Sequence, residues 1–490
     1  MLFNSYIFIF AFLPLALIGY FGLHKIKQSK IAKIYLCVMS LMFYAYFNLS
    51  YLGIIVSSIV INFLGSKLLI KVNNELKKKL LCIFLVAINI GVLVYYKYFD
   101  FLILNVNAIF KTSFNLLNIL LPLGISFFTF QQISFIIDSY KSKDGIKYKF
   151  WDYTLFVTFF PQLIARPIVS HDEIIPQFEN KENYKINAEN FSKGLMAFAF
   201  GLAKKVLIAD LFGNLVNIGF SDVDSLNTLT AFITMFSYTI QIYFDFSGYC
   251  DMATGIALMF NIKLPMNFNS PYKAVTITEF WKRWHMTLTR FFTQYVYIPL
   301  GGNRKGKIRT YVNIFIVFLV SGIWHGANYT FIIWGILHGI GNIFTRIFKS
   351  RIEKQNVVLN WLITFTFINI TWVMFRSNTV SEAILFYKKL ACFNFYDMTM
   401  LERMVNVFNI TELKFVYDLL PNIQTFFITY KIPIQIFMLF ALFAILEMKN
   451  TNERIECFKP NVRNVIVVST LLVISIMSLS QISTFLYFNF

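Results

Sequence analysis

Long apolar runs separated by short polar connections cover almost the whole chain. Most runs approach 20 residues, and a helix of about 20 apolar residues crosses the hydrocarbon core of a bilayer. Two shorter apolar pieces, at Phe101–Phe110 and Tyr153–Ala165, indicate interfacial or re-entrant segments. The pattern predicts an all-α polytopic membrane protein with about eleven spans, at Ser5–Leu23, Ile31–Phe47, Tyr51–Ile70, Leu80–Tyr96, Leu117–Ile137, Phe191–Phe212, Leu229–Phe244, Val312–Phe344, Val358–Phe375, Ile432–Leu446 and Val465–Leu479.

Lysine and arginine gather in the short connections, and the positive-inside rule assigns such connections to the cytoplasm. Lys25, Lys27 and Lys30 follow the first span, so the N-terminus is expected outside. The sequence shows no internal repeat, no low-complexity linker and no polar stretch long enough for a soluble domain. Residues 1–490 are therefore expected to form one integral membrane domain.

The composition supports the same class of protein. Hydrophobic residues make up 57% of the chain and charged residues 14%, whereas soluble domains carry about 25% charge. The formal net charge of +19 reflects the basic connections, because no nucleic-acid-binding motif is present. The spacing of the five cysteines indicates neither a disulfide framework nor a metal site: Cys37, Cys82, Cys250, Cys392 and Cys457.

A basic window interrupts the apolar pattern at Ile262–Tyr311, which we expect on the cytoplasmic side. A capping box formed by Thr276 and Glu279 predicts a helix that begins near Ile277. Helical spacing would place one set of mainly apolar residues on a single face: Trp281, Trp284, His285 and Leu288. Cations would cover another face, and a membrane-surface helix held by tryptophan and anionic lipid is the alternative interpretation.

His325 lies inside an apolar run, between Gly322 and Gly326. An ionisable residue within a membrane span indicates a functional site, although a hydrogen-bonded packing histidine is the alternative. His338 would lie well round the same helix if the run is continuous, and we interpret it as structural. Asp245 closes an apolar run, so this carboxylate is expected to pair with a cation. The pair would either orient a histidine or an arginine of the basic window, or serve structure alone.

Seven motifs follow one another from about Leu121 to Gly339: Pro122-Leu-Gly-Ile-Ser-Phe-Phe-Thr-Phe, Phe160-Pro-Gln-Leu-Ile-Ala-Arg-Pro-Ile-Val, Tyr243-Phe-Asp-Phe-Ser-Gly-Tyr, Asn267-Phe-Asn-Ser-Pro-Tyr, Phe280-Trp-Lys-Arg-Trp-His, Tyr297-Ile-Pro-Leu-Gly-Gly-Asn-Arg and Gly322-Ile-Trp-His-Gly-Ala. Together they resemble the membrane-bound O-acyltransferase family, and most closely its alginate O-acetyltransferase (AlgI) group. One departure is Arg166, at a position where the resemblance leads us to expect glycine.

The resemblance implies a ring of membrane helices around a tunnel. It implies that His325 is the catalytic histidine and that His285 is the second histidine of the family. Acyl groups would enter from the cytoplasm and be handed to an acceptor outside. The donor expected is acetyl-coenzyme A, with no bound cofactor and no metal.

Acyl transfer to a hydroxyl needs a base and a donor to the oxyanion. We assign the base to His325, while Asn328 could donate to the oxyanion and His285 could orient the thioester or assist proton movement. Arginine suits bidentate phosphate contacts, and the cations expected to hold the coenzyme A phosphates are Lys282, Arg283, Arg290, Arg304 and Lys305.

Three functions remain open on the sequence alone. The first is O-acetylation of an extracytoplasmic polysaccharide from the cell membrane, and the second is D-alanyl transfer to teichoic acid. The third is a proton-coupled transporter, which would predict inverted repeats that the sequence lacks. Because the polar stretches are too short to bind a polymer, the first function implies an extracytoplasmic SGNH-type acetyltransferase or esterase as partner.

Overall fold

A computed structural model describes residues 1–142, 145–163, 167–395, 399–408, 432–446, 448–479 and 486. These residues form helices joined by short connections and contain no strand. Six helical segments are long and apolar enough to cross a membrane: Phe8–Lys25, Ser50–Lys71, Glu75–Lys97, Lys307–His325, Tyr329–Ile347 and Val357–Arg376. The prediction of an all-α membrane fold is confirmed, whereas the count of about eleven spans is not.

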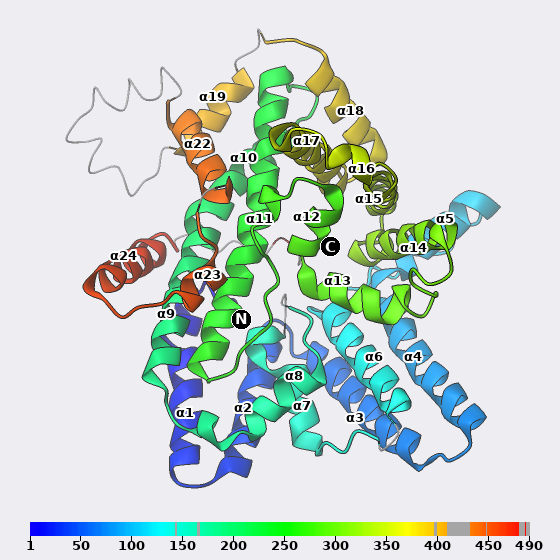
Figure 1. The fold of residues 1–490 in the computed structure, drawn as a ribbon, viewed down its shortest axis with the longest axis vertical. Coiled ribbons are helices and arrows are strands. Elements are labelled where there is room, and N and C mark those ends of the chain that lie inside the picture. The colour runs from blue at the N-terminus through cyan, green and yellow to red at the C-terminus, as the bar shows by residue number, and fades with distance from the viewer. Residues whose placement is uncertain are drawn as a thin grey trace.

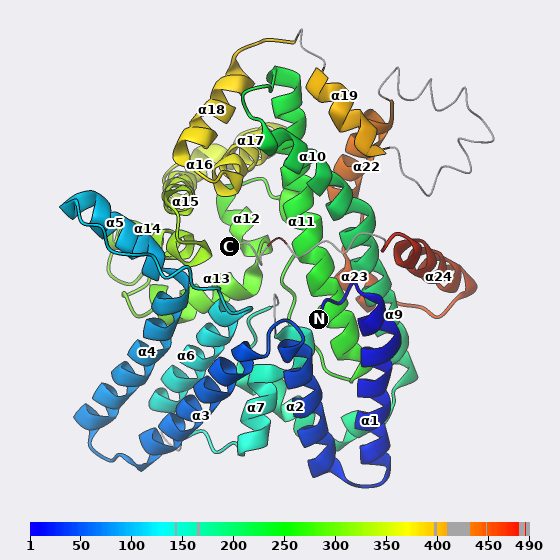
Figure 2. The same ribbon diagram turned by 180° about the vertical axis from the view of Figure 1, so that it is seen from behind.

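Most of the N-terminal helices lie in the lower half of the molecule, as seen from behind (Figure 2). Their bounds are α1 Leu13–Lys25, which continues the π-helical turn Phe8–Phe12, α2 Ser29–Ala45, α3 Ser50–Lys71, α4 Glu75–Lys97, α5 Phe99–Phe110, α6 Ile125–Lys141, α7 Phe150–Thr158 and α8 His171–Glu179. The short apolar piece Phe101–Phe110 lies in α5, and the piece Tyr153–Ala165 begins in α7; their interfacial or re-entrant position stays a prediction. Arg166 lies outside the described residues.

The long helix α11, Thr228–Met259, runs through the middle of the molecule (Figure 1). It packs against α9 (Ala188–Ala203), α10 (Asp210–Ser221) and α17 (Val357–Arg376). The prediction that this span ends at Phe244 is wrong, because the helix continues past two carboxylates. Lysines of the π-helical turn Lys204–Ala209 pair with them and make their burial tolerable.

Two other predicted spans differ from the structure. The segment Leu117–Ile137 is helical only from Ile125, because Pro122 and the left-handed Gly124 (φ 71°) precede the start of α6. The run Val312–Phe344 is not one helix but two antiparallel helices, α14 (Lys307–His325) and α15 (Tyr329–Ile347).

The remaining helices surround this core (Figure 1). The basic window contains the short helices α12 (Ile277–Arg283) and α13 (Met286–Phe292), a π-helical turn at Thr293–Tyr297 and the first residues of α14. The others are α16 Lys349–Ile352, α18 Val380–Ala391, α19 Thr399–Val405, α22 Ile432–Leu446, α23 Thr451–Glu456 and α24 Val462–Met477.

Candidate active site

The hairpin of α14 and α15 places His325 at the end of a helix, deep in the protein. The two helices approach closely where glycines meet: a Cβ on Gly322 would lie 2.4 Å from the carbonyl oxygen of Phe331. After His325 the backbone of Gly326 is extended and ends α14. Asn328 then caps α15 by accepting a hydrogen bond from the backbone N–H of Thr330 at 3.0 Å. The break between the helices therefore comes directly after the histidine.

Aromatic rings surround the buried His325 imidazole. The ring centroids of Trp324 and Trp334 lie 5.0 Å from it, and that of Phe375 lies 5.1 Å away. Trp334 and Phe375 meet it edge-on. This packing restricts the orientation of the imidazole.

His285 lies in a break of its own, between α12 and α13. Its φ of 44° is left-handed, which costs a non-glycine residue about 1–3 kcal/mol. The helix predicted through this residue is interrupted because the loop before it bonds the backbone: the Met286 N–H donates to the Asn267 carbonyl, and the Asn269 N–H to the Arg283 carbonyl, both at 2.9 Å. The prediction of one continuous helical face here is wrong, although the Thr276 cap on the Glu279 N–H is confirmed.

A single amide oxygen organises the turn around His285. Asn267 Oδ1 lies 3.2 Å from His285 Nδ1 and accepts a hydrogen bond from Thr287 Oγ1 at 2.9 Å. Because this oxygen can only accept, His285 Nδ1 carries the proton and donates. Burial lowers the pKa of His285 to about 3, so its ring is neutral at neutral pH. Trp324 neighbours both histidine rings, at 6.5 Å from His285 and 5.0 Å from His325.

His338 belongs to the same aromatic cluster, which sequence reasoning missed. Trp281 Nε1 donates to His338 Nδ1 at 3.1 Å, and the Trp334 ring lies 4.7 Å from the His338 ring. The prediction placed His338 far round one continuous helix, and that premise fails because the chain reverses before it. The two glycines around His325 were the available signal for the reversal.

Near His325, Gly326 and Phe331 line a cavity of about 870 Å³, which we call the large cavity. Amide side chains are prominent in its wall: Asn214, Asn217, Gln241, Asn328 and Asn378. Asp245 also lines it and pairs with Lys205 at 2.6 Å. Lys205 bonds Asp210 as well, at 2.8 Å. The expected pairing of Asp245 with a cation is confirmed, but its partner comes from outside the basic window.

A second cavity of about 260 Å³, the small cavity, opens near the basic window. Trp281, Lys282 and Arg346 line it, together with Ser321 of α14. Ser321 lies one helical turn before His325, whereas the large cavity begins directly after His325. Along the chain, His325 therefore lies between residues that line two separate cavities, and it belongs to neither lining itself.

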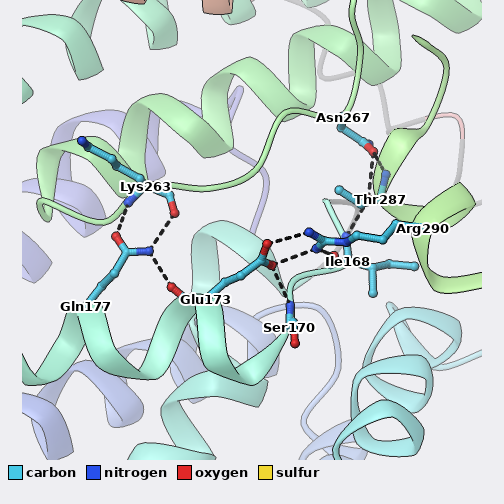
Figure 3. A network of polar contacts seen from close by, with 8 residues as sticks. All are labelled: Ile168, Ser170, Glu173, Gln177, Lys263, Asn267, Thr287 and Arg290. Atoms are coloured by element: carbon cyan, nitrogen blue, oxygen red, sulfur yellow. Dashed lines mark hydrogen bonds and ion pairs between the residues drawn. The ribbon is translucent and has the colours of Figure 1, made fainter. Parts of the chain in front are cut away.

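The cations predicted to hold a phosphate-bearing donor differ in their present partners. Arg290 makes a bidentate ion pair with Glu173, at 2.6 and 2.8 Å, and also donates to the Ile168 carbonyl (Figure 3). Arg283 pairs with Glu279 at 2.8 Å. Lys282 lines the small cavity, and Arg304 and Lys305 are exposed in the loop before α14.

Fold and site together define a class of protein: an all-helical membrane enzyme whose buried histidine lies, along the chain, between residues that line two cavities. The model of the membrane-bound O-acyltransferase family matches residues 141–380. The peptidoglycan O-acetyltransferase of Helicobacter pylori is 45% identical over 413 residues, covering 78% of each chain. The probable alginate O-acetylase AlgI of Pseudomonas aeruginosa is 36% identical, covering 82% of this chain and 77% of its own.

The chain belongs to the membrane-bound O-acyltransferase family and is an O-acyltransferase. A more distant relative is the teichoic acid D-alanyltransferase of Bacillus subtilis, which is 26% identical over 50% of this chain and 63% of its own. The resemblance recognised in the motifs is thus confirmed, and the transporter interpretation is set aside.

Proposed function

We propose that the protein moves acetyl groups from cytosolic acetyl-coenzyme A, across the cell membrane, for O-acetylation of an extracytoplasmic polysaccharide. One observation carries the proposal: His325 lies at the end of α14, along the chain between residues that line a cation-bordered small cavity and an amide-lined large cavity. The peptidoglycan and alginate acetylation named for the relatives supports acetyl as the group and a glycan as the acceptor. The D-alanyl transferase is less similar over a shorter stretch.

Charge supports a cytoplasmic small cavity and an outer large cavity. Helices α4 and α14 both begin beside lysine clusters, and both end at the large cavity. The positive-inside rule places such basic ends in the cytoplasm. In this orientation the basic window faces the cytosol, where Lys282, Arg304 and Lys305 are accessible to the phosphates of coenzyme A.

The chemistry follows from this arrangement. An acceptor hydroxyl in the large cavity gives its proton to His325 and attacks the thioester carbonyl. A C–O bond forms, the C–S bond breaks, and the proton passes to the coenzyme A thiolate. Asn328 Nδ2 donates one N–H to the Asn378 carbonyl at 2.6 Å, so its second N–H is available to the oxyanion in the cavity that it lines. His285 orients the thioester from the other side of Trp324.

A polymer cannot enter a cavity of about 870 Å³, so a carrier must bring the acceptor hydroxyl to it or take the acetyl group away. We infer an extracytoplasmic SGNH-type acyltransferase as that partner. A stable complex of this kind buries about 1,200–2,000 Å², which mild detergent extraction would preserve.

The test is transfer of radiolabelled acetyl from acetyl-coenzyme A in inside-out membrane vesicles that contain the full chain. His325→Ala should lower transfer by about 10²–10⁴-fold, the loss expected for a general base. His338→Phe, which keeps a ring in the same aromatic cluster, is the matched control and should lower transfer much less. Equal rates for wild type and His325→Ala would refute the assignment of the base. If purified protein alone acetylated polymeric glycan at full rate, no partner would be needed.

A further inference from the structure

Lys97, the last residue of α4, contacts the end of the histidine helix. Its Nζ donates to the carbonyl oxygens of Trp324 at 2.7 Å and His325 at 2.9 Å. The neighbouring Tyr98 hydroxyl donates to the Ile323 carbonyl at 2.8 Å. Two adjacent side chains from a distant part of the sequence thus bond the last three carbonyls of α14.

Those carbonyls need partners because a helix leaves its last four carbonyl groups without intrahelical hydrogen bonds. Trp324 and His325 are buried in the protein, and a buried polar group left unsatisfied costs about 1–3 kcal/mol. A cation is also the favoured partner there, since the C-terminal end of a helix carries partial negative charge. Lys97 meets both needs at the residue that carries the catalytic ring.

Lys97 has no carboxylate partner in any ion pair among the described residues. Its ammonium group lies 5.7 Å from the centroid of the Trp324 ring, so a cation–π contact accompanies the two carbonyl bonds. A neutral donor such as Tyr98 would suffice for a single carbonyl. An ammonium group has three N–H donors, which allows it to bond two carbonyls at once and to keep a third N–H.

Lys97 also lines the large cavity, so the same side chain connects His325 to the space proposed for the acceptor. The cavity leaves room for a larger cationic group at this position. A guanidinium also donates several N–H bonds in a fixed fork. Arginine should therefore replace lysine here, whereas an apolar side chain of similar length should not.

We propose that Lys97 is a positioning residue for the acyl transfer: it holds the C-terminal end of α14 so that the His325 imidazole faces the acceptor in the large cavity. This role rests on the proposed function. It concerns the acceptor side of the histidine, so loss of Lys97 should lower kcat and leave the KM for the donor unchanged.

The experiment compares Lys97→Met, Lys97→Arg and Tyr98→Phe in inside-out vesicles of the full chain. Lys97→Met should lower kcat by about 10²-fold, the cost of a misplaced catalytic group, at an unchanged KM for acetyl-coenzyme A. Lys97→Arg should restore most of the rate. Tyr98→Phe removes the neutral O–H donor that the Ile323 and Trp324 carbonyls share, at 2.8 and 3.4 Å, and should cost less than about tenfold. Equal losses in Lys97→Met and Tyr98→Phe, or no rescue by arginine, would overturn the proposal.

A second measurement does not depend on the donor. Diethyl pyrocarbonate modifies histidine rings, and mass spectrometry of the peptides gives the rate for each ring. His325 should react faster in Lys97→Met because the helix end loosens, and at the wild-type rate in Lys97→Arg, with the distant His171 as internal reference. An unchanged His325 rate in Lys97→Met refutes the positioning role. If wild type transfers no acetyl from acetyl-coenzyme A, the proposed function fails, and this labelling rate alone decides the role of Lys97.

Discussion

Replacing Lys205 with methionine should destabilise the protein strongly. Lys205 Nζ lies 2.6 Å from Asp245 and 2.8 Å from Asp210, and the exposed fractions of the Lys205 and Asp245 side chains are 5% and 2%. The matched control is Lys193→Met, which breaks a 2.6 Å pair with Glu189 on the surface, where the Glu189 side chain is 67% exposed. The two variants remove the same cation at similar distances and differ in burial.

The expected magnitude follows from the charge left behind. Removing one partner of a buried ion pair costs about 3–5 kcal/mol, because the other charge stays buried without compensation. Asp210 is 22% exposed and can be hydrated from the large cavity, so Asp245 carries most of the cost. We expect about 3 kcal/mol for Lys205→Met. Adding Asp245→Leu removes the stranded charge and should recover most of that loss.

The assay is unfolding by sodium dodecyl sulfate in mixed micelles, followed by the fluorescence of the seven tryptophans. Lys193→Met should unfold at the same dodecyl sulfate concentration as wild type, and Lys205→Met at a much lower one. The double variant should unfold at a concentration between those of Lys205→Met and wild type, close to that of wild type. If Lys205→Met is as stable as wild type, or the double variant as unstable as Lys205→Met, the buried ion pair does not stabilise the fold as argued.

Three further predictions follow from the site. Gly322→Val should separate α14 from α15 and abolish acetyl transfer, since a Cβ there would lie 2.4 Å from a backbone oxygen. Gly91→Val is the control and should transfer acetyl at the wild-type level, because a Cβ at Gly91 would have nothing within 4 Å. A cysteine at Lys305 should react with impermeant thiol reagents only in opened cells, and labelling of intact cells would invert the proposed topology. Trp281→Phe removes the hydrogen bond to His338 and should lower the thermal unfolding midpoint in detergent, because a buried acceptor loses its donor; an unchanged midpoint would contradict this.

The sequence predicted the helical class well because apolar runs alone decide which segments form helices in a membrane. It failed where a run contained a short break. Val312–Phe344 is apolar on average, and the polar residues His325 and Asn328 lie where α14 ends and α15 begins. The backbone signals were Gly326 and Asn328, which end one helix and cap the next. Local capping chemistry, rather than hydrophobicity, separates a long span from a hairpin.

The site was predictable only as far as single residues stand out. His325 did so because it is ionisable within an apolar run. The turn at His285 depends on Asn267 from the preceding loop, and the partner of Arg290 is Glu173, far away in the sequence. Lys97 gave no signal in the sequence, because lysines are common in the connections between the predicted spans. Partners that meet only in the folded chain cannot be read from spacing.

The break after His325 is explained by the chemistry that we propose for it. Non-helical backbone at membrane depth is tolerated where it is buried in protein or lines a cavity, and here both conditions hold: Lys97 and Asn328 bond the open helix ends, and the large cavity begins at Gly326. In an unbroken helix the His325 ring would project into packed neighbours on every side. At a helix end, an acceptor can approach it along the cavity while the other side faces the aromatic cluster. On the proposed function, the need for an acceptor to approach His325 from the large cavity accounts for a hairpin where the hydropathy pattern predicts a single span.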